Sequence, residues 1–122
     1  MASEISFSAS LSYAKSGTSL NRQCSTTLDV AGLKYADIVQ TIVTAGSTVT
    51  FGNIGTVGVF MLQNIDPTNY VDVGFDGTTY PVRLAAVSGT QGGFIIAPNN
   101  GSTIYARASV TGCNLLVRGV AP

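Results

Sequence analysis

The chain contains no histidine and no tryptophan, and few of its residues carry a charge. Of 122 residues, 10% are aspartate, glutamate, lysine or arginine, against about 25% in a typical soluble domain. Six basic side chains balance six acidic ones, so the formal net charge is zero. The lack of histidine excludes Ser-His-Asp and Cys-His catalysis, histidine metal ligands and an imidazole pH switch. Because no basic cluster is present either, we expect no direct binding of nucleic acid.

Cysteine is also scarce, with Cys24 and Cys113 near opposite ends of the chain. They form no Cys-x-x-Cys pair, so no zinc site is expected. A single disulfide would close a long loop. Met1 to Glu4 shows no basic stretch before an apolar run, so we expect no secretory signal and favour two reduced thiols. The most apolar stretch, Val57 to Leu62, is far shorter than the roughly 20 residues that span a bilayer, so no membrane contact is expected.

The N-terminal segment alternates between apolar side chains and serine. Ile5, Phe7, Leu11 and Tyr13 fall on one face, and serines fall on the other. A period of two predicts a strand with one buried face, because successive side chains of a strand point to opposite sides. The polar segment Lys15 to Gln23 that follows is interpreted as a loop.

Short alternating or β-branched segments separated by turn residues continue to the C-terminus. Strands are expected, among others, over residues 26–30, 37–44, 57–62, 70–75, 78–84, 104–110 and 114–120. Asp76-Gly77 predicts a two-residue type I′ hairpin turn, and Pro81 places its strand at a sheet edge or a bulge. The run Val57 to Leu62 is apolar on both sides, which indicates a central strand covered on both faces. Eight or nine short strands without helical periodicity predict an all-β, single-domain antiparallel sandwich, jelly-roll-like, over residues 1–122.

No set of residues is marked out for catalysis, a cofactor or a metal. Asp66, Asp72 and Asp76 are the only acidic cluster, and their spacing matches no calcium-binding loop. Asp66 and Asp76 are expected to form turns, and Asp72 is expected to face solvent from a strand. The glycine-rich segment Ser88 to Gly93 lacks the Lys-Ser/Thr pair and the helix of a phosphate-binding loop, so it is interpreted as a connection. We therefore expect a protein that is not an enzyme.

The low charge instead favours a surface that lies against other subunits. Soluble monomers protect sheet edges with lysine, and this chain has only Lys15 and Lys34. Burying neutral serine, threonine and asparagine side chains at an interface costs less than burying charge. Arg83, Arg107 and Arg118 lie in the C-terminal strands, where they pair with acidic groups of a partner or remain solvated.

The C-terminal half has a recognisable pattern. Its segments are Gln63–Gly74, Tyr80–Leu84, Ile104–Ala108 and Leu115–Val117, within roughly Val57 to Val120. In the first, an Asn-x-Asp turn followed by Thr-Asn leads into a strand of the form Val-x-Val-Gly. The pattern resembles small β-sandwich, jelly-roll virion proteins of tailed bacteriophages, of the capsid cement or decoration type.

This resemblance implies a structural protein on the exterior of a phage capsid. Such a protein is a homo-oligomer, typically a trimer, that clamps the major capsid protein after assembly in the host cytoplasm. Residues 1–14, through Ile5, Phe7, Leu11 and Tyr13, are the candidate inter-subunit strand, and pairing within the same domain is the alternative. A second hypothesis is a head-fibre or tail-associated module that binds a receptor or glycan. It would use exposed tyrosines and the loops Asp66–Asn69 and Pro98–Ser102.

Overall fold

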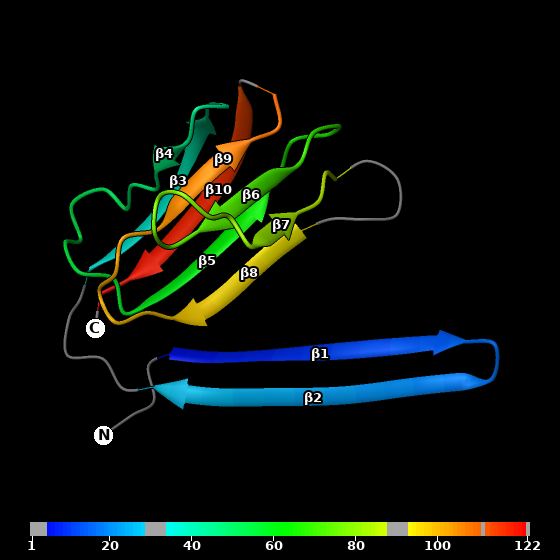
Figure 1. Cartoon of the computed structure of the whole chain (residues 1–122). Coiled ribbons are helices and arrows are strands. Elements are labelled where there is room, and N and C mark those ends of the chain that lie inside the picture. The colour runs from blue at the N-terminus through cyan, green and yellow to red at the C-terminus, as the bar shows by residue number, and fades with distance from the viewer. Residues whose placement is uncertain (1–4, 29–33, 88–92, 111, 122) are drawn as a thin grey trace. The chain divides into compact units, whose positions relative to one another are not determined.

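The computed structural model describes residues 5–28, 34–87, 93–110 and 112–121. Contacts between residues divide the chain into two compact units, Met1–Ala31 and Gly32–Pro122. Among the described residues, the first unit is a two-stranded hairpin and the second contains two four-stranded sheets (Figure 1). All of the elements are strands, which confirms the all-β prediction.

The N-terminal hairpin joins β1 (Ile5–Lys15) to β2 (Thr18–Leu28). The strands pair along their whole length, from Ile5 opposite Leu28 to Lys15 opposite Thr18. Ser16 and Gly17 connect them with φ angles of 51° and 82°. Two residues with positive φ make a type I′ turn, whose twist matches that of the flanking strands. This tight turn fixes the register of every pair that follows.

The predicted loop over Lys15 to Gln23 is wrong, because these residues form the turn and the first half of β2. Their polar side chains do not prevent a strand, since their backbone groups bond to β1 and their side chains stay in solvent. The strand expected over residues 26–30 is the end of β2, and its residues 29 and 30 lie outside the described part. The strand expected at the N-terminus is present from Ile5 onward, but its pairing partner is β2 and not a strand of the sandwich.

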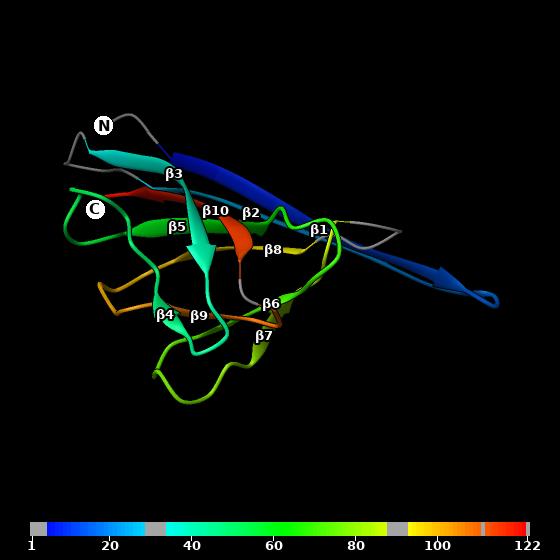
Figure 2. The ribbon, with the colours of Figure 1, turned by 90° about the horizontal axis from the view of Figure 1, so that it is seen from above.

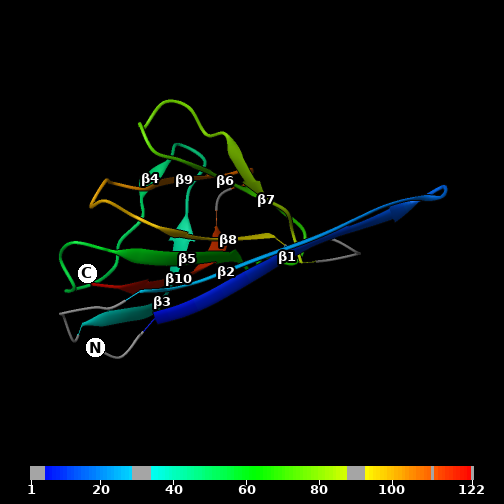
Figure 3. The same ribbon diagram turned by 90° about the horizontal axis from the view of Figure 1, so that it is seen from below.

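The sandwich in the second unit has the strand order of a jelly roll. Sheet I has the order β3-β10-β5-β8, formed by Tyr35–Ile42, Cys113–Val120, Val59–Asn64 and Gly93–Pro98. Sheet II has the order β4-β9-β6-β7, formed by Ser47–Thr48, Tyr105–Ala108, Val71–Gly74 and Val82–Leu84. Consecutive strands alternate between the sheets except β6 and β7, and Figures 2 and 3 show the sheets as two layers. An eight-stranded double sheet of this kind is a jelly roll.

The expected fold is therefore confirmed, with ten described strands in place of the eight or nine expected. Eight belong to the sandwich and two to the hairpin.

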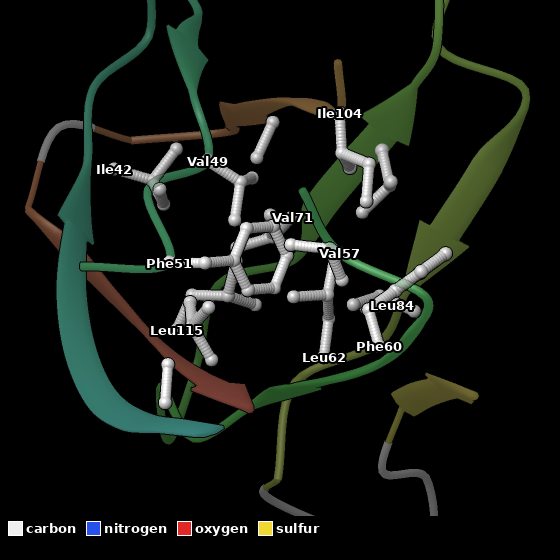
Figure 4. Packing of buried hydrophobic residues seen from close by; sticks show 14 of the residues in the cluster. Ile42, Val49, Phe51, Val57, Phe60, Leu62, Val71, Leu84, Ile104 and Leu115 are labelled. Atoms are coloured by element: carbon white, nitrogen blue, oxygen red, sulfur yellow. The ribbon is translucent and has the colours of Figure 1, made fainter. Parts of the chain in front are cut away.

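The core lies between the two sheets. Inward-pointing side chains from both layers meet there, and ten of them are labelled in Figure 4: Ile42, Val49, Phe51, Val57, Phe60, Leu62, Val71, Leu84, Ile104 and Leu115. Strand β5 is central in sheet I, as the apolar run predicted. Only one of its faces meets the core, however, because Met61 and Gln63 on its other face are half-buried. Within the sandwich unit, β5 is thus covered on one face, and not on both faces as was expected.

The connection between β6 and β7 differs from the two-residue turn expected at Asp76-Gly77. The strands end at Gly74 and resume at Val82, so a longer loop joins them. Gly77 has a φ of 81°, but Asp76 does not share the positive φ that a type I′ turn requires. The Asp76 carboxylate instead accepts hydrogen bonds from the backbone N–H groups of Thr78 (2.9 Å) and Thr79 (2.7 Å). Strand β7, which follows Pro81, lies at the edge of sheet II, as the proline predicted.

Candidate functional site

The hairpin, called the arm below, gathers its apolar side chains on one face. Opposed residues of an antiparallel pair point to the same side. The register therefore places Phe7, Ala9, Leu11 and Tyr13 of β1 with Leu20, Arg22, Cys24 and Thr26 of β2. Leu11 is 63% exposed, and Tyr13 and Leu20 are exposed as well. Three expected interaction residues, Phe7, Leu11 and Tyr13, thus share one face. The side chain of Ile5, the fourth, lies outside the described part.

The other face of the arm is polar except for one alanine. It consists of Ser6, Ser8, Ser10, Ser12 and Ala14 with Ser19, Asn21, Gln23, Ser25 and Thr27. A two-stranded hairpin alone is at best marginally stable in water, because it buries little apolar surface. The outer edges of β1 and β2 also have no partner strand among the described residues. An amphipathic ribbon of this kind gains stability by laying its apolar face on another surface.

The outer face of sheet I is the second apolar surface. Leu115 and Val117 are buried in the core, so Leu116 between them points outward. The register continues this row from Val39 through Leu116 and Gln63 to Phe94. The adjacent row runs from Asp37 through Arg118 and Met61 to Ile96. Tyr35, Val39 and Phe94 are 74%, 57% and 62% exposed.

Charge on this outer face is limited to one ion pair. Arg118 donates to the Asp37 carboxylate at 3.0 Å, so the third expected partner-binding arginine is engaged within its own chain. The β-branched residues of β3 predict a strand, but they do not predict this outer face. Its apolar side chains come from four strands, and only the sheet order brings them together.

The outer face of sheet II carries a compact ionic and aromatic cluster. Asp72 is 5% exposed, although it points away from the core between the buried Val71 and Val73. Arg83 covers it from β7, with Nε and Nη2 at 2.8 and 3.2 Å from the two carboxylate oxygens. From β9, Arg107 places Nη2 3.8 Å from Asp72 Oδ2. The hydrogen bond to Asp72 raises the pKa of Arg83.

Each arginine of this cluster also stacks on a tyrosine. The guanidinium of Arg83 lies 3.8 Å from the ring centre of Tyr70, and that of Arg107 lies 4.4 Å from the ring centre of Tyr80. The prediction that Asp72 faces solvent is wrong, because the sheet register sets it directly between Arg83 and Arg107. A carboxylate removed from water needs paired charges and hydrogen bonds, and these side chains provide them.

Replacing Arg83 and Arg107 together by alanine should destabilise the sandwich more than the sum of the two single changes. Each single variant leaves Asp72 with one cation, whereas the double variant leaves a buried carboxylate unpaired. Urea unfolding of the four chains measures this coupling. Arg118→Ala is the control, since its partner Asp37 is exposed and the change should be small. Additive effects at Arg83 and Arg107 would contradict the shared role.

Asp66 and Asp76 form turns, as predicted. The Asp66 carboxylate accepts from the backbone N–H groups of Thr68 (2.9 Å) and Asn69 (2.8 Å), and Asp76 does the same for Thr78 and Thr79. These backbone hydrogen bonds lower the pKa of both carboxyl groups, because they favour the charged form.

The free energy of unfolding should therefore fall on acidification. A carboxyl group whose pKa is lower in the folded than in the unfolded chain stabilises the fold above its unfolded pKa of about 3.9. This contribution is lost as the pH drops through the lower folded value. Urea midpoints between about pH 6 and pH 2 measure the loss. The double variant Asp66→Asn and Asp76→Asn, whose amide oxygens still accept the bonds, should show a smaller pH dependence, and an identical profile would contradict the assignment.

A hollow of about 540 Å³ lies beside the loop that follows β8. Its lining combines Phe60 and Phe75 with Ala97, Pro98, Asn99, Asn100 and Ser102. One of the two loops named in the glycan-binding hypothesis, Pro98–Ser102, thus contributes to it. The side-chain amide of Asn99 donates to the backbone oxygens of Val57 (3.3 Å) and Ser102 (3.1 Å), and Asn100 Oδ1 accepts from the backbone N–H of Ser102 (3.2 Å). These amides therefore shape the loop.

The structure contains both cysteines as free thiols. Cys24 is exposed on the apolar face of the arm, and Cys113 is buried in the sandwich core. Burial raises the pKa of the Cys113 thiol. In the described part of the chain, no three acidic or cysteine side chains come together as metal ligands. The described residues also contain no helix that could cross a bilayer. Residues 88–92 of the glycine-rich connection lie outside the described part.

Comparison with known proteins adds no family to this picture. No protein-family model, curated protein or solved structure matches the chain.

Proposed function

We propose that the protein is a structural subunit of a phage particle, a decoration protein on the capsid exterior. In this role it forms a homo-oligomer, a trimer by resemblance, and binds the major capsid protein. Its assembly takes place in the host cytoplasm. The observation that carries the proposal is the arm, which presents apolar side chains and unpaired strand edges to solvent.

The arm is suited to joining subunits because it offers two kinds of contact at once. The outer edges of β1 and β2 can add to a neighbouring sheet through backbone hydrogen bonds. Leu11, Tyr13 and Leu20 can be removed from water at the same time. Burial of such side chains contributes roughly 1.5–3 kcal/mol each, so a few of them stabilise an interface substantially.

The sandwich supports the same role through its neutral, partly apolar exterior. Tyr35, Val39 and Phe94 are exposed on one sheet face, where a monomer normally carries polar groups. The arginines engage Asp72 and Asp37 inside the chain, so little unpaired charge would be buried at an interface. Packing between subunits would then rest on area and shape.

The alternative function is a receptor- or glycan-binding module, and the hollow beside Pro98–Ser102 is the observation in its favour. The tyrosines do not strengthen it. Tyr70 and Tyr80 each hold an arginine against the ring, and Tyr35 lies on sheet I. Specific retention of a glycan on an array by the purified protein, with no binding to capsids, would favour this alternative.

The arm proposal is tested by changing one face of the ribbon at a time. The triple variant Leu11→Ser, Tyr13→Ser and Leu20→Ser keeps the hairpin turn and removes the apolar face. The matched control, Ser10→Thr, Ser12→Thr and Ser25→Thr, alters the polar face with residues that favour strands. Light scattering gives the molecular mass, and co-sedimentation with phage heads lacking the protein gives the binding. We expect the first variant to be monomeric and unbound and the control to behave like the native chain.

Two results would overturn the proposed function. One is a native protein that stays monomeric and does not sediment with heads. The other is an arm variant that assembles and binds as well as the native chain. Quantitative mass spectrometry of purified particles adds an independent measure, because a decoration protein is present in hundreds of copies and a fibre or tail part in a handful.

A further inference from the structure

We propose that the outer face of sheet I receives the arm of a neighbouring copy of the same chain. This inference rests on the proposed function and names the surface to which the arm binds. It starts from two apolar faces that have no partner within their own unit, one on the arm and one on sheet I.

The two faces match in chemistry. The face of sheet I has apolar side chains in adjacent rows, with Val39, Leu116 and Phe94 in one row and Met61 and Ile96 in the next. The charges of Arg118 and Asp37 on this face cancel each other, because the two side chains form an ion pair. The apolar face of the arm offers Phe7, Leu11, Tyr13 and Leu20 with one arginine among them. Joining them removes apolar surface from water on both sides without leaving an acidic group unpaired.

The arm is narrow enough to lie within the width of sheet I. Neighbouring strands lie roughly 5 Å apart, so a two-stranded ribbon covers about half the width of a four-stranded sheet. Sheets stack face to face at about 10 Å, which leaves room for one layer of side chains from each. The arm would thus add a third layer to the jelly roll of the copy that receives it.

Arm length favours a neighbouring copy over the same chain. Strands of eleven residues span roughly 36 Å, whereas the longest strands of sheet I have eight residues and span roughly 26 Å. The chain connects the arm to its own sandwich at the base, after Leu28. Exposed Tyr13 and Leu20 lie at the other end, near the Ser16-Gly17 turn, and Leu11 lies near the middle of β1. The end of the arm with exposed apolar side chains is therefore the end away from the connection to its own sandwich.

The contact is heterologous, because each copy offers an arm and receives another on a different surface. Interfaces of this type close into rings when the rotation between copies permits. In a ring of three copies, every arm would lie on a sheet I face and every sheet I face would hold an arm. This arrangement agrees with the proposed trimer.

Cys24 makes the contact testable, because it is a natural thiol on the apolar face of the arm. Val39→Cys, Gln63→Cys and Phe94→Cys place a second thiol at three points across one row of sheet I. Three positions are used so that at least one comes within the 4.4–6.8 Å Cα separation of a disulfide. Each is combined with Cys24→Ser in a tagged acceptor chain and mixed with the native chain as donor. Under mild oxidation, we expect a covalent donor–acceptor product that a reductant reverses.

The matched control moves the donor thiol by one residue. In a donor carrying Gln23→Cys and Cys24→Ser, the thiol lies on the polar face of the arm, because successive side chains alternate. We expect loss of the cross-linked product with this donor. Oxidation of the native chain alone identifies any Cys24–Cys24 product.

The remaining outcomes separate this inference from the proposed function. A second set of chains carries Val39→Cys, Gln63→Cys or Phe94→Cys and keeps Cys24. In these chains, a disulfide within one chain reports contact between the arm and its own sandwich. A cross-link only within a chain would show that the arm lies on its own sandwich and would overturn the inference. Absence of any product from all three acceptors would also overturn it. If the Leu11, Tyr13 and Leu20 variant nevertheless loses assembly and head binding, the proposed function stands and the arm binds another surface, such as the capsid protein.

Discussion

Replacing Asn64 by aspartate or alanine is expected to lower the free energy of unfolding by about 3 kcal/mol. The side chain of Asn64 is completely buried. Its amide nitrogen donates to the backbone oxygens of Asn69 (2.8 Å), Leu84 (3.0 Å) and Ala85 (3.2 Å). Its amide oxygen accepts from the backbone N–H of Asp66 at 2.9 Å. Asn64 thus ties the end of β5 in sheet I to the end of β7 in sheet II.

The size of this effect follows from what the substitutions leave behind. Alanine deprives three backbone acceptors and one donor of their partner in a region closed to water. Aspartate keeps the size of asparagine but has no N–H group to donate, so it separates loss of hydrogen bonds from loss of packing. The thermal midpoint should fall by roughly 12 to 24 °C, because a domain of this size loses about 4 to 8 °C per kcal/mol.

Urea and thermal unfolding measure the change, and Asn53→Ala is the matched control. Asn53 is exposed, so its replacement should leave the midpoint close to that of the native chain. An Asn64→Asp variant as stable as the native protein would mean that the three hydrogen bonds donated by the Asn64 amide do not stabilise the fold in solution.

Deleting residues 1–31 is expected to abolish assembly while leaving the sandwich folded. The buried core cluster draws its members from Ala36 to Val117, so the deletion removes none of them. The contacts of the chain also divide at this boundary. Strand content by circular dichroism should therefore correspond to the eight sandwich strands, and the midpoint should shift by less than in the Asn64 variants. Oligomers and binding to phage heads should both be lost.

Two outcomes of the deletion would contradict this prediction. A truncated chain that assembles at the same concentration as the native one would locate the interface in the sandwich alone. A truncated chain that fails to fold would contradict the expectation that the sandwich folds without the arm.

Local patterns of the sequence were sufficient for the general architecture. Apolar residues alternate with serine from Phe7 to Tyr13, and this period of two is that of a strand and not of a helix. Turn residues divide the chain into further short strands of this kind, such as β9. The position of Pro81 was likewise sufficient to place β7 at an edge, because proline cannot donate to a ladder.

The features that were not predicted, the environments of Asp72 and Asn64, depend on which strands lie side by side, and local sequence patterns do not show this. Asp72 meets Arg83 and Arg107 only because β6 lies between β7 and β9. Asn64 is buried because two sheets converge at that point, and nothing in its immediate neighbours distinguishes it from a turn asparagine. One local signal does predict the hairpin. Ser16-Gly17 is a pair that favours a turn, and the segments on both sides of it can form paired strands.

The strand order also affects when a newly made chain can associate. Because β3 pairs with β10, sheet I cannot form until β10 has been synthesised. The arm closes around two residues, and hairpins of this kind form within microseconds. On a ribosome, the arm can therefore form before the outer face of sheet I exists. If that face receives the arm of another copy, as we propose, association between copies begins only after β10 has joined sheet I.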